Sequence, residues 1–135
     1  MSNVLYATGR NAFANAGINW TSDTIKAILI DIAQYTVDLA LHDFLNDIPA
    51  GARVAIASLS GKSASAGVCD AEDTVFSSVS GVSAEAIVLY KDTGTESTSQ
   101  LIAYIDTAAS GLPATPTGTN ITIAWDNGAN KIFKL

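Results

Sequence analysis

The chain has 135 residues, of which 48% are hydrophobic and only 15% are charged, and its formal net charge at pH 7 is −6. This length fits one domain that buries about two-thirds of the surface its unfolded chain would expose. The seven Lys and Arg residues are scattered singly along the sequence. This disfavours nucleic acid and anionic membranes as partners, because both are recognised by clustered basic residues. The low charge suits a surface that is partly buried in an assembly.

The first residues lack the basic segment followed by an apolar run that a signal peptide requires, and no stretch approaches eighteen uninterrupted apolar residues. We therefore expect synthesis in the cytoplasm. Cys69 is the only cysteine, so no disulfide can form within the chain. We interpret it as a buried, unreactive thiol.

One helix is predicted at the N-terminus, over residues 3–16. Ser2 or Asn3 is placed to cap its first turn, and Gly17 is placed to take the left-handed conformation that ends a helix. Its apolar residues form one narrow stripe: Leu5, Ala12, Phe13 and Ala16. A helix this short is stabilised mainly by packing that stripe, so we treat residues 1–17 as a docking element.

Residues 24–31 have a nearly continuous apolar, β-branched pattern that indicates a strand buried on both faces, although a short helix stays open as an alternative. The pattern breaks down over residues 33–48, where polar residues interrupt the apolar ones at both helical and strand spacing. We expect a long irregular excursion there, with one helical turn near residues 42–46. Pro49 and Gly51 close it.

The middle of the chain predicts further strands. Residues 53–59 resume strand character, residues 61–73 form a loop of small residues without regular structure, and residues 74–79 alternate as a half-buried strand does. Residues 86–90 and 101–105 are apolar runs rich in β-branched and aromatic residues, joined by a polar loop. They predict a hairpin at the centre of the fold.

The last third contains a connector rich in Gly, Pro and Thr at residues 110–119, followed by residues 121–135. There the pair Asn127-Gly128 stands between two alternating arms, which predicts a second hairpin. In all, the sequence predicts six to eight mostly antiparallel strands and one N-terminal α-helix. This indicates a single mainly β domain over residues 1–135, either a β-sandwich or a small barrel.

Chemical motifs are weak. His42 is the only histidine, and it lies near acidic residues that make a carboxylate-paired histidine one interpretation and a solvated loop residue the other. Asp70, Glu72 and Asp73 could bind a hard cation, but the spacing of a calcium-binding loop is absent. The sequence Gly61-Lys62-Ser63 lacks the earlier glycine of a phosphate-binding loop. We therefore predict no enzyme activity, no metal and no cofactor.

Five segments carry a family resemblance: residues 48–55 (IPAGARVA), 85–94 (EAIVLYKDTG), 101–106 (LIAYID), 111–113 (GLP) and 125–133 (WDNGANKIF). Together they resemble a family of small virion structural proteins of tailed bacteriophages. The likeness runs from about residue 24 to the C-terminus, and residues 5–20 resemble the lead-in helix of that family. The shared motifs are turn glycines and core strands, so no catalytic residue is carried over.

The resemblance implies a capsid decoration, or cement, protein on the outer surface of the virion, made in the host cytoplasm. It further implies the major capsid protein as partner and a homo-oligomer, with a trimer favoured. A tail or neck component is the alternative within the same class. A carbohydrate- or ligand-binding β-module that uses exposed Trp or Tyr is the alternative from a different class.

Contact surfaces are predicted where apolar residues have no clear buried face in a self-contained sandwich. The helix with its approach to Trp20, the excursion at 33–48 and the small-residue loop at 61–68 meet this criterion. The candidate contact residues are Leu5, Phe13, Trp20, Val37, Leu39, Leu41 and Phe44.

Overall fold

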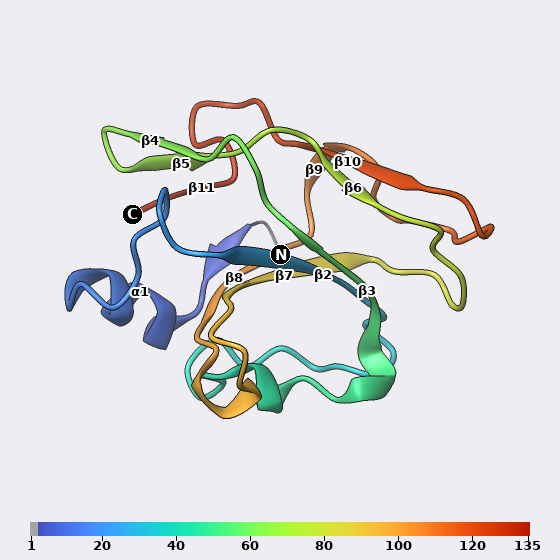
Figure 1. Ribbon diagram of the computed structural model, residues 1–135, viewed down its shortest axis with the longest axis horizontal. Coiled ribbons are helices and arrows are strands. Elements are labelled where there is room, and N and C mark those ends of the chain that lie inside the picture. Colours follow the sequence, from blue (N-terminus) through green and yellow to red (C-terminus); the bar gives the residue numbers. More distant parts are fainter. Residues whose placement is uncertain (1–2) are drawn as a thin grey trace.

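The computed structural model describes residues 3–135. Within them the chain is mainly β, with eleven strands in three antiparallel sheets and one α-helix. Figure 1 shows a layered arrangement in which a central sheet lies between two small sheets on one side and irregular chain on the other. The prediction of a mainly β, sandwich-like domain is confirmed, although the strand number exceeds the six to eight expected because several strands have only two or three residues.

The central sheet has five strands in the order β1-β8-β7-β2-β3. Their bounds are β1 Val4–Leu5, β2 Ile25–Ile30, β3 Arg53–Ser58, β7 Ala86–Lys91 and β8 Leu101–Ile105. Strands β7 and β8 are buried over almost their whole length. Both of their faces are covered, which is why their sequences read as continuous apolar runs rather than alternating ones.

The upper cover of the central sheet consists of two three-stranded sheets, in the orders β6-β10-β9 and β11-β5-β4. Their bounds are β4 Ser63–Ser65, β5 Val68–Asp70, β6 Thr74–Phe76, β9 Ala108–Ser110, β10 Ile121–Trp125 and β11 Phe133–Lys134. Inward side chains such as Phe76, Ile123 and Phe133 meet Leu29 and Leu89 of the central sheet in the larger of two core clusters. This cluster is the interior of the sandwich.

The lower cover of the central sheet is residues 31–52, which contain no strand and only two short 3₁₀ turns, η1 Leu45–Asp47 and η2 Ala50–Ala52. Tyr35, Leu45 and Ile48 from this segment pack in a second core cluster on the sheet residues Ile28 and Val88. The predicted irregular excursion is therefore correct, but the segment has a clear buried face, contrary to the expectation that it lacked one. The predicted helical turn at 42–46 is replaced by η1.

In place of a ladder, the backbone groups of the lower cover form isolated turn bonds with one another and bonds to side chains. The Asp38 carboxylate accepts the N–H groups of Ala40 and Leu41 at 3.1 and 3.0 Å. Arg53 donates to the carbonyl of Ile48 at 2.7 Å and to that of Leu45 at 3.0 Å. Buried backbone groups must find partners, and here polar side chains supply several of those that the turn bonds leave unpaired.

The strands predicted at 24–31, 53–59, 86–90 and 101–105 are confirmed as β2, β3, β7 and β8, and the last two pair as the expected antiparallel hairpin. Strand β2 lies between β3 and β7, and most of its residues are buried. The helical alternative for residues 24–31 is thus excluded.

Residues 61–73 were predicted to lack regular structure, and this is wrong. They form the hairpin of β4 and β5, in which Ser65 pairs with Val68 across a two-residue turn. Ala66 and Gly67 both have positive φ, +52° and +80°, as such a turn requires. Alanine is uncommon at this conformation, so the sequence carried no clear turn signal.

The hairpin predicted for residues 121–135 is also wrong. Strand β10 lies between β6 and β9, so both of its edges are already occupied. Strand β11 pairs with β5 in the other small sheet, Phe133 opposite Cys69. The Asn127-Gly128 segment therefore connects two sheets instead of turning one strand back on the other.

Helix α1 spans Ala7–Ala14 and is shorter than predicted. Its N-cap is Tyr6 without a side-chain bond, so Asn3 does not cap it, while the alternative cap Ser2 lies outside the described residues. Ala16, rather than Gly17, takes positive φ at its end. The helix docks on β8 of its own chain through Gly9, where a Cβ atom would come within 2.5 Å of the Leu101 carbonyl oxygen.

Candidate contact surfaces

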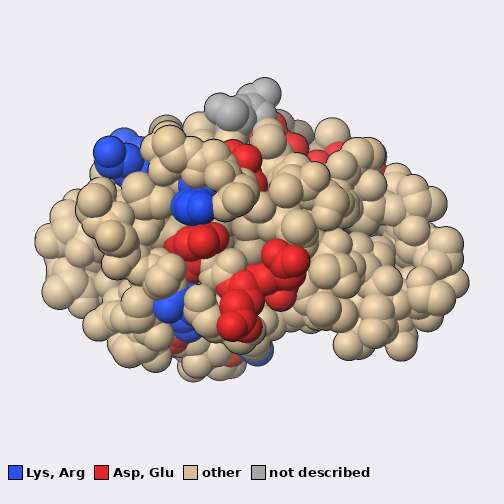
Figure 2. Space-filling model, turned by 90° about the horizontal axis from the view of Figure 1, so that it is seen from above, with Lys and Arg blue, Asp and Glu red and all other residues tan. Residues whose placement is uncertain are grey.

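The most distinctive surface is a part of the upper cover that carries no charge. We call it the uncharged lobe and define it as residues 74–84 and 107–125, which contain β6, β9, β10 and their adjoining loops and have no Asp, Glu, Lys or Arg. Figure 2 shows the charged side chains gathered over the centre and one end of the upper face, while the opposite end is free of them. This segregation follows directly from the two uncharged stretches of sequence.

The outer face of this lobe is lined by small side chains. Val75 pairs with Thr122 and Ser110 pairs with Ala124, and these four residues alternate with the inward-facing core residues of the same strands. Val75 is 48% exposed and Val82, in the following loop, is 57% exposed. Small uncharged residues lose little side-chain entropy on contact and need no desolvation of charge, so this face suits close packing against a protein.

Ion pairs cluster instead around one end of the central sheet. Among the described residues, Lys26 pairs with Asp92 at 3.0 Å and Lys91 pairs with Asp23 at 3.2 Å. The N–H of Gly94 and the nearby Lys26 hold the pKa of Asp92 below its ordinary value. The N–H of Asn19 and then Lys91 do the same for Asp23. These pairs fix the end of the sheet where β7 leaves for β8.

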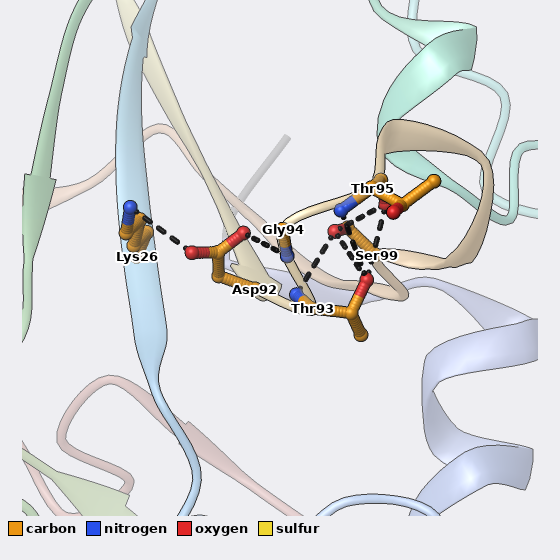
Figure 3. Close-up of polar contacts among 6 residues, drawn as sticks. All are labelled: Lys26, Asp92, Thr93, Gly94, Thr95 and Ser99. Carbon is orange, nitrogen blue, oxygen red and sulfur yellow. Dashed lines mark hydrogen bonds and ion pairs between the residues drawn. The ribbon is translucent and has the colours of Figure 1, made fainter.

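The loop from β7 to β8 is a folded, hydroxyl-rich turn (Figure 3). The Ser99 hydroxyl, which is fully buried, donates to the Thr95 carbonyl at 2.8 Å and accepts the Thr93 N–H at 3.2 Å. The Thr93 hydroxyl also bonds the Thr95 carbonyl. These contacts within the loop give the exposed tip at Gly94 a fixed shape without a hydrophobic core.

A chain of polar side chains runs through the lower cover. The Tyr6 and Tyr35 hydroxyls lie 2.8 Å apart, and the Tyr35 hydroxyl lies 2.8 Å from Nδ1 of His42. The Asp38 N–H also donates to that nitrogen at 3.2 Å. Burial raises the pKa of Tyr35 to about 12 and that of Tyr6 further. His42 is thus neither carboxylate-paired nor a solvated loop residue; it anchors the cover to the core.

Three of the seven predicted contact residues lie near the N-terminal helix. Leu5 and Trp20 are only 8% and 4% exposed and belong to the core of their own chain, so they offer little surface to a partner. Phe13 is half-buried, with its ring 6.0 Å from that of Phe133. Docking of residues 1–17 on another subunit stays a prediction. The three residues expose less apolar surface for such a contact than the sequence led us to expect.

The other four lie in the lower cover. Val37 and Leu39 are half-buried against the second core cluster, and Phe44 is half-buried beside β8, forming an isolated bridge with Gln100. Leu41 is 76% exposed and is the one residue of the seven that is fully available. The structure therefore does not unite the seven residues into one surface.

Sequence reasoning missed Val75 and Val82 as surface apolar residues. A signal was present, because both lie in stretches without charge. The alternation at 74–79 was recognised, but the sequence alone does not say which of its two faces is buried.

The aromatic residues do not form an exposed platform for sugars. Trp20 and Trp125 are 4% and 5% exposed, and their indole N–H groups donate to the carbonyls of Asp70 and Glu72, each at 3.1 Å. The tyrosines Tyr6, Tyr35, Tyr90 and Tyr104 are buried too. The alternative of a ligand-binding module that uses exposed Trp or Tyr loses its structural basis.

A pocket of about 280 Å³ opens between β1, α1 and β11. Its lining mixes Arg10, Lys131 and Lys134 with Asp126. Val4, Leu5, Ile132 and Phe133 also line it, so polar and apolar groups are mixed there, whereas binding sites for small organic ligands are mostly apolar.

Over residues 3–135, no group of three or more His, Cys, Asp or Glu is placed to hold a metal ion. The acidic residues at 70, 72 and 73 are thus not assembled into a cation site in this part of the chain. Within the same residues, no helix is both long and apolar enough to cross a bilayer.

Comparison with known proteins adds no identification. No protein-family model matches the chain, and no curated protein sequence does. Its function is therefore argued from its own residues and surfaces.

Proposed function

We propose that this protein is a non-enzymatic structural component of a phage virion, a decoration protein that binds the assembled capsid shell and stabilises it. Its partner is the major capsid protein, and its place is the outer capsid surface. A protein that binds only the assembled lattice stabilises that lattice by mass action. Presentation as a homo-oligomer, for which the sequence resemblance favours a trimer, multiplies weak contacts.

The observation that carries the proposal is the uncharged lobe. A protein of net charge −6 keeps its charges away from two long stretches that fold together into one end of the molecule. Charged residues are depleted at the centres of protein interfaces. The tightly bonded fold behind the lobe also suits a structural role, because a rigid surface loses little entropy on binding.

The test uses particles assembled without this protein. We expect purified protein to bind them and to raise the temperature at which they release their contents. If neither occurs, the proposal is wrong. If labelled protein is found on the tail or neck instead of the shell, the tail alternative replaces it.

A variant pair assigns the contact surface. Val75→Lys places a charge on the exposed face of the lobe, and we expect it to weaken particle binding by about tenfold or more. Ser65→Lys adds the same charge to an exposed strand of the other small sheet, and it should bind as the unaltered protein does. If both variants bind equally well, the protein attaches through another surface.

A further inference from the structure

The fold brings together basic residues that the sequence scatters. Of the seven Lys and Arg residues, three form ion pairs within residues 3–135, namely Lys26, Arg53 and Lys91. Three of the other four line the pocket between β1, α1 and β11, and none of these three has a carboxylate partner in the described part of the chain. They are Arg10 from α1, Lys134 from β11 and Lys131 from the segment before β11.

The lining of this pocket is positive in a protein whose net charge is −6. Asp126 is the only acidic residue among the lining residues, so three positive charges less one negative charge leave +2. The Asp126 carboxylate also accepts the N–H of Gly128 at 3.3 Å. Gathering cations without counter-charges is unfavourable, and an anion bound between them removes that cost.

Lys131 is held in place on the protein side of the pocket. Its Nζ donates to the side-chain oxygen of Asn127, and its N–H donates to the Gly128 carbonyl at 3.1 Å. Asn127 is neutral, so the charge of Lys131 stays uncompensated. The φ of Lys131 is +48°, a conformation that is uncommon for lysine. Such backbone outliers are found often where a protein holds a ligand.

The same pocket has an apolar part. Leu5, Ile132 and Phe133 line it and are at most 8% exposed, while Arg10 and Lys134 are exposed. Its volume of about 280 Å³ lies near the lower limit for small-ligand pockets. The mixed lining does not suit an uncharged ligand, because the cations would lose water without gaining a partner. It suits a small group that is charged at one end and apolar at the other.

We propose that this pocket binds an organic anion in which a carboxylate adjoins an apolar group. The carboxylate accepts hydrogen bonds from the cations, and the apolar group packs on Leu5 and Phe133. Hydrogen bonds between charged groups are about twice as strong as neutral ones. The C-terminal residue of another protein chain and a free carboxylic acid both have this chemistry. The inference does not depend on the proposed function, and its test uses no virus particles.

The experiment titrates ¹⁵N-labelled full-length protein with N-acetyl-leucine and follows amide chemical shifts. We expect saturable shifts at millimolar concentration for Leu5, Lys131 and Phe133. N-acetyl-leucinamide lacks the charge and should bind about tenfold more weakly or not at all. Inorganic phosphate lacks the apolar group and should also bind more weakly. The absence of saturable shifts at these residues overturns the proposal, as does equal binding of the amide or of phosphate.

Variants that change the charge of the pocket test its residues. Arg10→Gln combined with Lys134→Gln should weaken the binding of N-acetyl-leucine by about tenfold. Lys62→Gln removes the same kind of charge outside the pocket and is the matched control. Asp126→Asn removes the one negative charge of the lining and should tighten binding, which a loss of structure would not do. If the double variant and the Lys62 control bind equally well, the cations do not hold the ligand.

A peptide distinguishes the two sources of the carboxylate. Acetyl-Gly-Gly-Leu with a free C-terminus should bind at least as tightly as N-acetyl-leucine if the pocket receives the end of a protein chain. Weaker binding of the peptide than of N-acetyl-leucine would assign the pocket to a free carboxylic acid. Both results keep the chemistry proposed here, whereas shifts confined to residues outside the pocket overturn it.

Discussion

The two covers of the central sheet bury similar side chains by different means. The upper cover is built from short strands whose backbone groups pair with one another in two small sheets. The lower cover has no ladder, and its backbone groups are satisfied by isolated backbone bonds in turns together with side chains such as Asp38 and Arg53. A ladder spreads stability over many equivalent bonds, whereas the lower cover concentrates it in a few residues. The difference predicts where single substitutions act locally and where they act on the whole domain.

The largest effect is expected in the upper cover, at Phe76. Its side chain is fully buried in the cluster between the sheets. Phe76→Ala should reduce the free energy of unfolding by about 3–5 kcal/mol, through lost burial and the cavity left behind. Urea denaturation followed by circular dichroism measures it. Val75→Ala, one position away on the exposed face, is the control and should cost less than about 1 kcal/mol.

The next effect is expected at Arg53, which ties the lower cover to β3. Arg53→Met keeps the apolar part of the side chain but leaves the Leu45 and Ile48 carbonyls without their donor. We expect a loss of about 2–3 kcal/mol. Amide exchange should accelerate in residues 43–52 more than in the upper cover.

The matched control for Arg53 is Glu96→Gln. It removes only the exposed partner of the 2.8 Å ion pair and should have little effect on stability. If Arg53→Met instead accelerates exchange equally in both covers, the lower cover is not a separate unit of stability.

A smaller effect is expected from the tyrosine chain. Tyr35→Phe removes the hydroxyl between Tyr6 and His42 and leaves the buried Tyr6 hydroxyl without its partner. The expected cost is about 1–2 kcal/mol in thermal or urea unfolding. Tyr6→Phe should reduce the free energy of unfolding less when it is added to the Tyr35→Phe variant than when it is made in the unaltered protein, because the two hydroxyls satisfy each other. Strict additivity would show that the bond between them contributes nothing.

The smallest effect is expected on the pH dependence of stability, through Asp92 and Asp23. The pKa of Asp92 and that of Asp23 are lowered in the folded protein, so each carboxylate contributes stability that is present above its unfolded pKa of about 4. That contribution is lost as the pH falls through the lower folded pKa. Asp92→Asn should cost less than about 1 kcal/mol at pH 7 and almost nothing near pH 2. Urea midpoints measured from pH 7 to pH 2 test this, and a pH-independent difference would contradict it.

The strands of the central sheet were predictable because their signal is local. Residues 25–30, 86–91 and 101–105 combine continuous apolar character with β-branched and aromatic residues, and few other structures accommodate such runs. The short strands were not predictable. Ser63–Ser65 consists of small residues with little preference of their own, and it is a strand because Val68–Asp70 pairs with it.

The candidate contact surfaces also divide into a part that could be predicted from the sequence and a part that could not. Leu5 and Trp20 looked available because nothing local shows that β8, β5 and β11 enclose them, and burial of that kind depends on residues far along the chain. The uncharged stretches at 74–84 and 107–125 were visible in the sequence. Their union into one lobe was not, since β6 and β9 become neighbours of β10 only in the folded sheet.

By itself, the sequence determined the β class, the central hairpin and the uneven distribution of charge, because each follows from the chemistry of adjacent residues. The tertiary structure alone decided that β10 and β11 belong to different sheets, that the lower cover buries its apolar residues, and that β3 is the last strand of the central sheet. Those outcomes depend on which distant strands compete for the same backbone groups, and a hydrophobic pattern does not encode that competition.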